Sequence, residues 1–404
     1  MSVNRLYIFM TTSISQLGGA ERYMEGKTRW LIKNGWKVAI VGPYTDAPAC
    51  DYGEARIFDF RYYGCKPEVL LRGIRYRCVS ELLSYSSSFN EVHIESASFQ
   101  MAYWGDFIAS RLKCFHHVFY LHEQVPELNC SELKLFQSKL TDGELFFISK
   151  GFCNLLHLDS GDWNPVLRAG APKAIQDIPY AGDSTHLVPA HYRIGCISRL
   201  DKTFLKNVTS ALSEIVTRRP GFKVELVLVG NAEDPNSKQE LEALAVDGVE
   251  LIFTGGLSPI PLCLVRTFDA AVGKSGGASC VAAEGIVTIS VALDTDRCMG
   301  VLGFDIDKNV CEADGNVKDM TETFEEVIFG SRYATKPCPL EIAGPAEPNY
   351  AEHFEKFGKG SSRTIDMYTS TSSSFRQHVK GFLFSVLGYR ASERLIDFVG
   401  GERG

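Results

Sequence analysis

Short apolar runs alternate along the chain with segments whose apolar positions recur every three to four residues. The first run, residues 5–10 (RLYIFM), predicts a strand. After a polar loop, a helical pattern continues to about Lys33 and stops before an Asn-Gly pair, and residues 37–41 predict the next strand. Residues 5–41 therefore predict a βαβ unit.

The same alternation continues through the first part of the chain. Further strands are predicted at 55–60, 91–95, 116–121 and 145–148, and helices near 67–85, 99–112, 131–139 and 150–157. A sheet whose strands alternate with helices is doubly wound, and its ligands bind beyond the carboxyl ends of the strands. Candidate side chains stand at such ends, namely Ser96, His122 and Ser149. A single histidine at a strand end is more often structural than catalytic.

A second series begins after a stretch without periodicity. The pattern fades over 158–190, which is typical of a linker. Strands are then predicted at 193–197, 224–229, 250–253, 268–272 and 287–292, with helices at 207–218, 236–246 and 278–285. The expected fold class is α/β with two Rossmann-like domains, 1–185 and 186–340, followed by a C-terminal segment, 341–404, that returns toward the first domain.

Charge and cysteine content exclude several classes of protein. The 404 residues carry a net charge of −7, which argues against nucleic acid as a partner because that partner requires a strongly basic surface. The 12 cysteines form no Cys-x-x-Cys pair, and several lie within apolar runs. We therefore expect neither a metal site nor a disulfide framework. This use of cysteine predicts that the protein resides in the reducing cytoplasm. No apolar run approaches the ~18 residues of a membrane span.

Residues 193–207 (RIGCISRLDKTFLKN) combine a buried strand, a basic loop and a predicted helix start. Arg199, Lys202 and Lys206 stand between the strand and a helical pattern that begins at Asn207. Cations beside the free N–H groups of a helix N-terminus favour a phosphate. The alternative is an ordinary solvated loop, since lysines are common between a strand and a helix.

A second glycine-rich turn, Gly273-Lys274-Ser275-Gly276-Gly277, follows the strand at 268–272. It is not a nucleoside-triphosphate P-loop, because position 268 is Phe where that motif requires glycine. It leads into a predicted helix and so also presents N–H groups to an anion. Glu284 is predicted about two turns into that helix, where sugar or ribose hydroxyls could donate to it; an exposed helix end is the alternative.

The combination of these features resembles the family 4 glycosyltransferases. The resemblance covers roughly residues 5–335 and is strongest in SISQLGGAERY (13–23), RIGCISRLDKTFLKN, VELVLVGNAED (224–234) and GGASCVAAEG (276–285). It implies a GT-B fold, with two Rossmann-like domains facing a cleft. It also implies transfer of a sugar from a nucleotide-diphosphate sugar, as substrate rather than cofactor, to a glycan or lipid-linked acceptor with retention of anomeric configuration.

The resemblance also assigns roles to individual residues. His122 would face the reacting centre, and Arg199 and Lys206 would hold the diphosphate without a metal ion. The expected donor-binding residues are Gly18, Gly19, Lys202, Gly230, Lys274, Gly276, Gly277, Ala278 and Glu284.

The chain departs from the family pattern at two places. The interval from Arg199 to Lys206 is seven residues, longer than is usual, so Lys202 is an alternative phosphate ligand. Gly276 stands where the family has the first Glu of its paired carboxylates, so backbone N–H groups of 276–278 would have to replace that contact. These departures leave open a non-catalytic sugar-binding subunit and, as a weaker alternative, a nucleotide-sugar epimerase.

Two segments of this acidic chain are locally basic and aromatic. The first contains Arg61, Tyr62, Tyr63, Lys66, Arg72, Arg75, Tyr76 and Arg77, and the second contains Lys380, Phe382, Leu383, Phe384, Val386, Leu387, Arg390 and Arg394. Such a composition suits peripheral contact with an anionic membrane. A solvated helix face for the first segment and a core helix for the second explain the pattern slightly better, because both segments can bury their apolar sides against protein.

Overall fold

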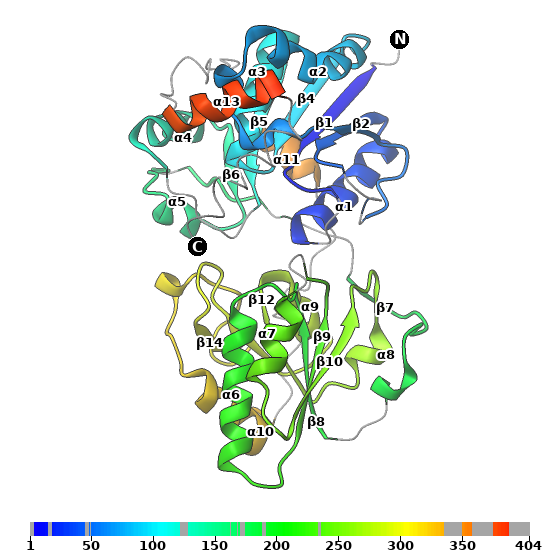
Figure 1. Cartoon of the computed structure of the whole chain (residues 1–404), viewed down its shortest axis with the longest axis vertical. Coiled ribbons are helices and arrows are strands. Elements are labelled where there is room, and N and C mark those ends of the chain that lie inside the picture. Colours follow the sequence, from blue (N-terminus) through cyan, green and yellow to red (C-terminus); the bar gives the residue numbers. More distant parts are fainter. Residues whose placement is uncertain are drawn as a thin grey trace. The chain divides into compact units, whose positions relative to one another are not determined.

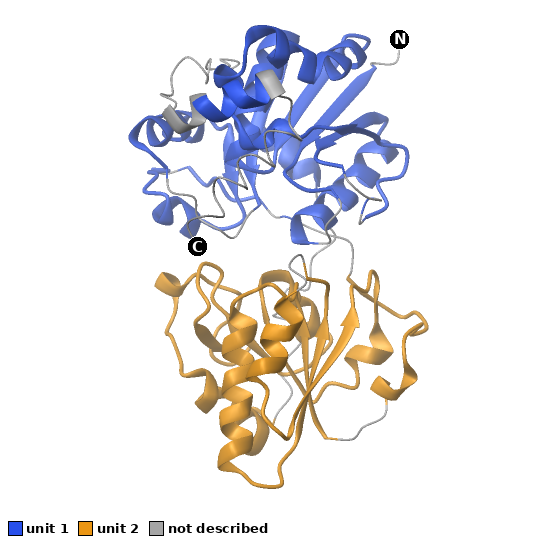
Figure 2. Ribbon diagram, viewed as in Figure 1, with its two compact units in different colours: residues 1–172, 348–404 blue, residues 173–347 orange. Residues whose placement is uncertain are grey.

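The computed structural model describes residues 4–14, 18–44, 48, 50–121, 128–161, 163–167, 169, 174–187, 191–232, 236–334, 350–357 and 375–387. The chain divides into two compact units (Figure 2). Unit 1 comprises Met1–Pro172 and Pro348–Gly404, and unit 2 comprises Lys173–Glu347. The boundary predicted after residue 185 thus falls later than the observed one, because Ile175–Gln176 already pairs with a strand of unit 2.

Unit 1 is built on a six-stranded sheet in the order β3-β2-β1-β4-β5-β6, with every pairing parallel (Figure 1). The strands are β1 (Arg5–Met10), β2 (Trp36–Gly42), β3 (Arg56–Asp59), β4 (Glu91–Ser96), β5 (Phe115–Tyr120) and β6 (Leu145–Phe147). The central β1 is buried at every position after its first residue, as expected for a parallel strand covered on both faces. The strand order reverses between β1 and β4.

The helices of unit 1 come from both ends of the chain. They are α1 (Gly19–Lys33), α2 (Arg72–Ser86), α3 (Phe99–Leu112), α4 (Cys130–Thr141), α5 (Gly151–Leu155), α11 (Tyr350–Phe357) and α13 (Phe375–Leu387), with 3-10 turns η1 (Tyr62–Gly64) and η2 (Pro67–Val69). In α11, Tyr350 and Phe357 join the buried cluster that contains Tyr7 and Phe9 of β1. This contact places α11 within the core of unit 1.

Unit 2 repeats the same topology. Its sheet has the order β10-β9-β8-β12-β13-β14, parallel except for the antiparallel pair β13 and β14. The strands are β8 (Tyr192–Ile197), β9 (Val224–Val229), β10 (Val249–Gly255), β12 (Ala270–Lys274), β13 (Thr288–Val291) and β14 (Cys298–Val301), and β7 (Ile175–Gln176) pairs separately with β11 (Ile260–Pro261).

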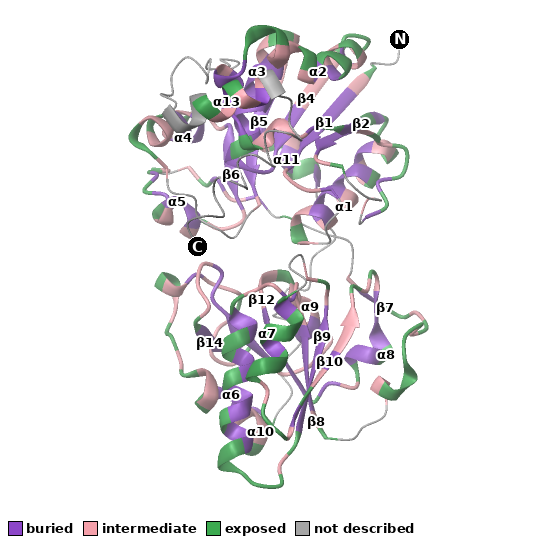
Figure 3. Ribbon diagram, viewed as in Figure 1, coloured by how far each residue is buried: buried purple, intermediate pink, exposed green. Residues whose placement is uncertain are grey.

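The helices of unit 2 connect these strands. They are α6 (Phe204–Arg218), α7 (Ser237–Leu244), α8 (Leu262–Val265), α9 (Ser275–Ala282) and α10 (Met320–Phe329), with 3-10 turns η3 (Ser184–Leu187) and η4 (Glu312–Asp314). One face of α6 is buried and the other is exposed (Figure 3), because Phe204, Val208, Leu212 and Ile215 recur at helical spacing.

Three boundaries in unit 2 differ from the predicted ones by three residues. Helix α6 begins at Phe204 rather than Asn207, since both Phe204 and Leu205 are fully buried. Helix α9 begins at Ser275 and ends at Ala282, three residues earlier at each end than predicted from the apolar pattern. Its first turn contains two glycines, which carry no side chain by which a helical pattern could be recognised.

Candidate functional site

The carboxyl edge of the unit 2 sheet gathers most of the candidate residues. Strand order reverses between β8 and β12, which pair in parallel with Ala271 opposite Gly195. In open parallel sheets the loops after two such strands border the ligand site. The loop with Arg199 and Lys202 follows β8, and α9 follows β12. The topology therefore brings these two segments to one edge of the sheet.

Two glycines permit close backbone contacts at this edge. A Cβ atom added to Gly277 would lie 2.2 Å from the carbonyl oxygen of Ile197, at the end of β8. A Cβ atom added to Gly230, just after β9, would lie 1.9 Å from the carbonyl oxygen of Ser198. Both neighbours are backbone atoms, which cannot rotate away. The N-terminus of α9 is therefore held directly against the loop after β8.

The first turn of α9 has the features of an anion site. An α-helix leaves the N–H groups of its first turn without helical partners, and its dipole favours negative charge there. Gly276 is exposed, with no atom within 4 Å of an added Cβ, whereas Ala278 is buried. The first turn of α9 is thus open on the side where Gly276 would carry a side chain.

Ser275 was not recognised from the sequence as a site residue. Its φ of 54° lies in the left-handed region, which is uncommon for a residue other than glycine and is frequent at functional sites. The side chain of Asn309 holds this turn by donating to the Ser275 carbonyl oxygen at 2.9 Å and to the Ser279 hydroxyl at 2.5 Å. The sequence does contain a signal for this residue, namely a strand followed directly by GKSGG and a helix. Such an abrupt strand-to-helix turn requires an unusual backbone conformation at one residue.

Lys274 has a structural partner within this edge. Its Nζ donates to the carbonyl oxygen of Thr295 at 3.0 Å and lies 3.9 Å from a carboxylate oxygen of Asp296. Thr203, just before α6, donates its hydroxyl to the same Asp296 carboxylate. Lys274 therefore fixes the loop after β13, and Asp296 of that loop links it to the start of α6.

The three candidate cations after β8 lie in different environments. Arg199 is 31% exposed in its side chain and lies 3.5 Å from Asp201. Lys202 is half-buried in the same loop. Lys206 instead stands in the first turn of α6, where its Nζ lies 2.9 Å from Glu240 of α7. The loop thus contributes Arg199 and Lys202 to the edge, whereas the ammonium group of Lys206 is directed toward α7.

Glu284 lies apart from the glycine turn. It follows the end of α9 by two residues, in a turn where its N–H donates to the Val281 carbonyl oxygen. At 1.5 Å per residue, the eight residues of α9 span about 12 Å. The expectation that Glu284 stands inside the helix is therefore wrong, and the helix length separates it from the N–H groups at Gly276.

The corresponding edge of unit 1 presents the Gly18-Gly19 turn. Gly18 is the N-cap of α1 in an extended conformation, and an added Cβ on Gly19 would meet no atom within 4 Å. This turn follows β1, beside the strand-order reversal between β1 and β4. His122, expected at the reacting centre, lies outside the described residues.

A Ser–His–Asp array in unit 1 has the distances of a nucleophile triad. The Ser96 hydroxyl lies 3.0 Å from His116 Nε2, and His116 Nδ1 lies 2.9 Å from an Asp106 carboxylate oxygen. All three residues are at most 1% exposed, so a substrate has no access to the hydroxyl. Burial also lowers the pKa of His116. The array therefore joins β4, β5 and α3 rather than performing catalysis.

A second buried polar cluster surrounds Glu95 of β4. One of its carboxylate oxygens accepts hydrogen bonds from the Tyr7 hydroxyl at 2.5 Å and the Tyr23 hydroxyl at 3.2 Å, and pairs with Lys27 at 2.5 Å. Burial opposes ionisation of Glu95, but Lys27 and the hydrogen bond from His117 outweigh it and hold its pKa well below the usual range. The cluster is a paired charge within the core.

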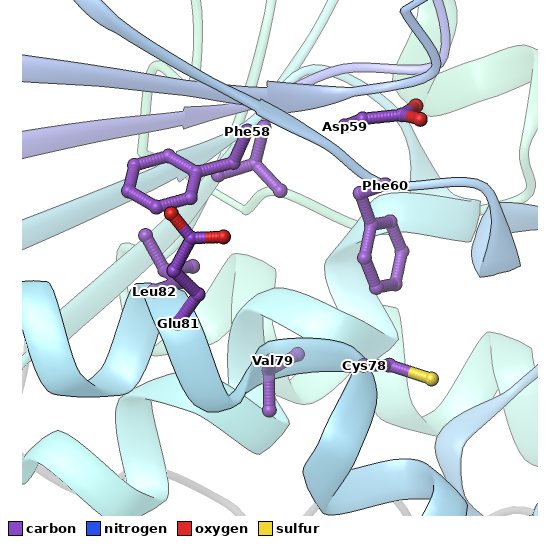
Figure 4. Close-up of a pocket in the computed structure, with 8 residues that line it drawn as sticks. Phe58, Asp59, Phe60, Cys78, Val79, Glu81 and Leu82 are labelled. Carbon is purple, nitrogen blue, oxygen red and sulfur yellow. The ribbon is translucent and has the colours of Figure 1, made fainter.

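One hollow in unit 1 lies between β3 and α2, lined by Val41, Phe58, Asp59, Phe60, Cys78, Val79, Glu81 and Leu82 (Figure 4). Its volume of about 50 Å³ is far below the several hundred Å³ of pockets for cofactor-sized ligands. This hollow is therefore not the site of a nucleotide.

The described residues contain no group of three or more His, Cys, Asp or Glu side chains arranged to hold a metal ion. No helix in the same part of the chain is long and apolar enough to cross a membrane.

Comparison with known proteins shows the fold. No protein-family model and no curated protein matches the sequence. Solved structures do match along most of the chain. A mutant of TarM from S. aureus, in complex with Fondaparinux, alpha-GlcNAc-glycerol and UDP, is 8% identical over 88% of this chain and 100% of its own, with a TM-score of 0.53.

Two further structures have similar coverage. HepE from Anabaena, in complex with UDP-glucose, is 11% identical over 87% of this chain and 99% of its own, with a TM-score of 0.54. A putative UDP-N-acetylglucosamine 2-epimerase from Listeria monocytogenes is 13% identical over 86% of this chain and 92% of its own, with a TM-score of 0.49. At such low sequence identity, the similarity to these structures shows the fold alone. The chain has the two α/β units with parallel sheets that are found in GT-B proteins.

Proposed function

We propose that the protein is a retaining glycosyltransferase that moves a sugar from a nucleotide-diphosphate sugar to a glycan or lipid-linked acceptor. The observation that carries this proposal is the contact between Gly277 and the Ile197 carbonyl oxygen. It holds the N-terminus of α9 against the loop that contains Arg199 and Lys202. A helix N-terminus beside guanidinium and ammonium groups suits a leaving diphosphate.

In this proposal unit 2 binds the donor. The N–H groups of 276–278 and the Arg199 guanidinium would hold the diphosphate, each charge-assisted hydrogen bond contributing ~1.5–3 kcal/mol. The open space at Gly276 leaves room for the donor phosphates or sugar, where the family 4 enzymes have a carboxylate. Lys274 would act mainly by positioning, because its ammonium group already holds the loop after β13.

Unit 1 would bind the acceptor. Gly18 and Gly19 are expected instead to meet the donor phosphate or sugar, and the open face of Gly19 lets a ligand approach the N-terminus of α1. His122 is proposed to face the reacting centre on the strength of the family resemblance alone. No carboxylate is assigned as a covalent nucleophile.

UDP-sugars are the first donors to test, because the TarM and HepE structures contain UDP and UDP-glucose. Purified protein should release UDP from at least one UDP-sugar, and NMR of the sugar product should show transfer or hydrolysis with retained anomeric configuration. A C2 epimer with no UDP release would replace the proposal with an epimerase. Donor binding without turnover in the presence of candidate acceptors would instead indicate the non-catalytic subunit.

Donor turnover is expected to survive removal of divalent metal ions. Phosphate neutralisation by Arg199 and the α9 N-terminus needs no ion, so the rate of UDP release should be unchanged after EDTA treatment. A coupled assay for UDP, run before and after desalting into EDTA, measures this. Loss of turnover that manganese alone restores would contradict the metal-free arrangement.

Lys206 and Glu240 provide a test of the basic loop. If Lys206 leaves Glu240 to bind the diphosphate, Lys206→Ala should weaken UDP binding about tenfold, on the order of 1.4 kcal/mol, whereas Glu240→Ala should not. Titration calorimetry with UDP compares the two variants. Equal and negligible effects would restrict Lys206 to an exposed ion pair between α6 and α7 and leave Lys202 as the second phosphate ligand.

A further inference from the structure

Helix α13 packs against the segment that leads into α2, although some 300 residues separate them in sequence (Figure 1). The Leu71 N–H donates to the Ser385 hydroxyl at 3.2 Å. A Cβ atom added to Gly381 would lie 2.5 Å from the Val69 carbonyl oxygen, so the two backbones are in close contact. Phe384 is buried there. Residues 379–385 of the second basic and aromatic segment therefore lie against residues 69–71 of the first, whereas Arg390 and Arg394 lie outside the described residues.

This surface carries the most exposed large apolar side chains of the described residues. Phe382 is 58% exposed, Leu71 is 55% exposed and Val379 is 42% exposed. Val379, Phe382 and Ser385 follow one another at intervals of three residues, so they share one face of α13. Because Ser385 contacts Leu71, the apolar side chains of both segments project from neighbouring positions.

Cations accompany these apolar side chains. Arg72 and Arg77 are exposed in the first two turns of α2, and neither forms an ion pair with a described residue. Lys380 is half-buried, with its Nζ 5.4 Å from the centre of the Phe384 ring. The segments 69–80 and 375–387 contain no aspartate or glutamate, but Glu68 and Glu81 stand directly on either side of the first, and Glu81 lies 2.9 Å from Arg56. Lys66 does not belong to this surface, because it is buried and lies 2.9 Å from Glu132.

We propose that this α13–α2 patch, formed by Leu71, Arg72, Arg77, Val379, Lys380 and Phe382, binds the surface of an anionic lipid bilayer. Exposed apolar side chains that enter the headgroup boundary, with cations beside them, fit that partner. A second copy of the chain fits less well, because a two-fold interface would bring the same cations together. The inference stands on the patch itself and goes beyond the proposed donor chemistry.

Flotation with lipid vesicles tests the proposal on the full chain. Vesicles of phosphatidylcholine with ~30% phosphatidylglycerol should bring the protein to the top of the gradient, and pure phosphatidylcholine should not. Arg72→Ser with Arg77→Ser should weaken binding roughly tenfold or more, since each cation near the surface contributes to the attraction. Leu71→Ser with Phe382→Ser should weaken vesicle binding to a similar degree at high salt, where apolar contacts with the bilayer dominate the remaining affinity.

Matched controls come from cations and apolar side chains elsewhere. Lys33→Ser with Lys223→Ser removes two exposed cations, and Val246→Ser with Val317→Ser removes two partly exposed apolar side chains. Both control variants should float as the wild type does, and thermal unfolding should show that all four variants are folded. UDP binding should also be unchanged in the patch variants, which separates a failure here from a failure of the proposed function.

Three outcomes would overturn the proposal. The first is that equal amounts of protein float with anionic and neutral vesicles. The second is that the patch and control variants lose flotation equally. The third is that the protein floats with neither kind of vesicle. Concentration-dependent dimerisation that Phe382→Ser abolishes, without lipid binding, would assign the patch to a second copy of the chain.

Discussion

Replacement of Gly277 by alanine should abolish binding of nucleoside diphosphates. The added Cβ would meet the Ile197 carbonyl oxygen at 2.2 Å, and a backbone atom cannot move aside without shifting β8 or α9. We expect the N-terminus of α9 to be displaced from the loop that contains Arg199, with a loss of at least a hundredfold in affinity. Overpacking of this kind also costs about 1–3 kcal/mol of stability. Calorimetric titration and thermal unfolding measure the two effects.

Gly276→Ala is the matched control for that variant. Its added Cβ has no atom within 4 Å, so stability should be retained or rise by a few tenths of a kcal/mol, as for glycine replaced in a helix. The methyl group would nevertheless occupy the space proposed for the donor and should weaken binding. Wild-type affinity in Gly276→Ala would mean that the open side of this turn does not face the nucleotide.

Arg199→Ala should weaken nucleotide diphosphate binding by ten- to a hundredfold. The guanidinium can donate two parallel hydrogen bonds to phosphate, and charged hydrogen bonds contribute ~1.5–3 kcal/mol. Because the side chain is 31% exposed and its ion pair with Asp201 is long at 3.5 Å, its removal should leave the unfolding temperature almost unchanged. Titration with UDP and with uridine separates the phosphate contribution from that of the nucleoside.

Two further variants show whether Arg199 acts through its geometry. Arg199→Lys keeps the charge but loses the planar pair of donors, so it should recover only part of the affinity. Arg218→Ala removes an arginine from the far end of α6 and should bind UDP normally. An Arg199→Ala variant that binds as tightly as Arg218→Ala would exclude Arg199 from the donor site.

The order of elements was predictable from the sequence, and several boundaries coincide with the structure. The strand at 224–229 and the helix at 99–112 have the predicted bounds, because each begins and ends where its apolar pattern does. The doubly wound topology followed from the alternation of strands and helices. Neither β14 nor α10 was predicted. Strand β14 (Cys298–Val301) is only four residues long and antiparallel, and the alternation before it gave no sign of such a strand.

The candidate site was less predictable than the fold. The sequence placed Arg199, Lys202, Gly276 and Gly277 at strand ends, and the topology brings their loops together. It could not show that Lys206 is directed toward Glu240, because that contact joins two helices and depends on where α6 begins. Contacts between distant segments, such as Leu71 with Ser385, likewise follow from tertiary packing rather than local pattern.

Hydrogen–deuterium exchange tests directly whether a nucleoside diphosphate binds at the carboxyl edge of the unit 2 sheet. The protein should be compared with and without saturating UDP, and with GDP, ADP and CDP if UDP does not bind. We expect slower exchange of the backbone N–H groups in 275–279 and 199–203, with little change in the outer helix α10. Binding of a diphosphate that leaves both segments unprotected, or slows exchange in unit 1 alone, would contradict this expectation.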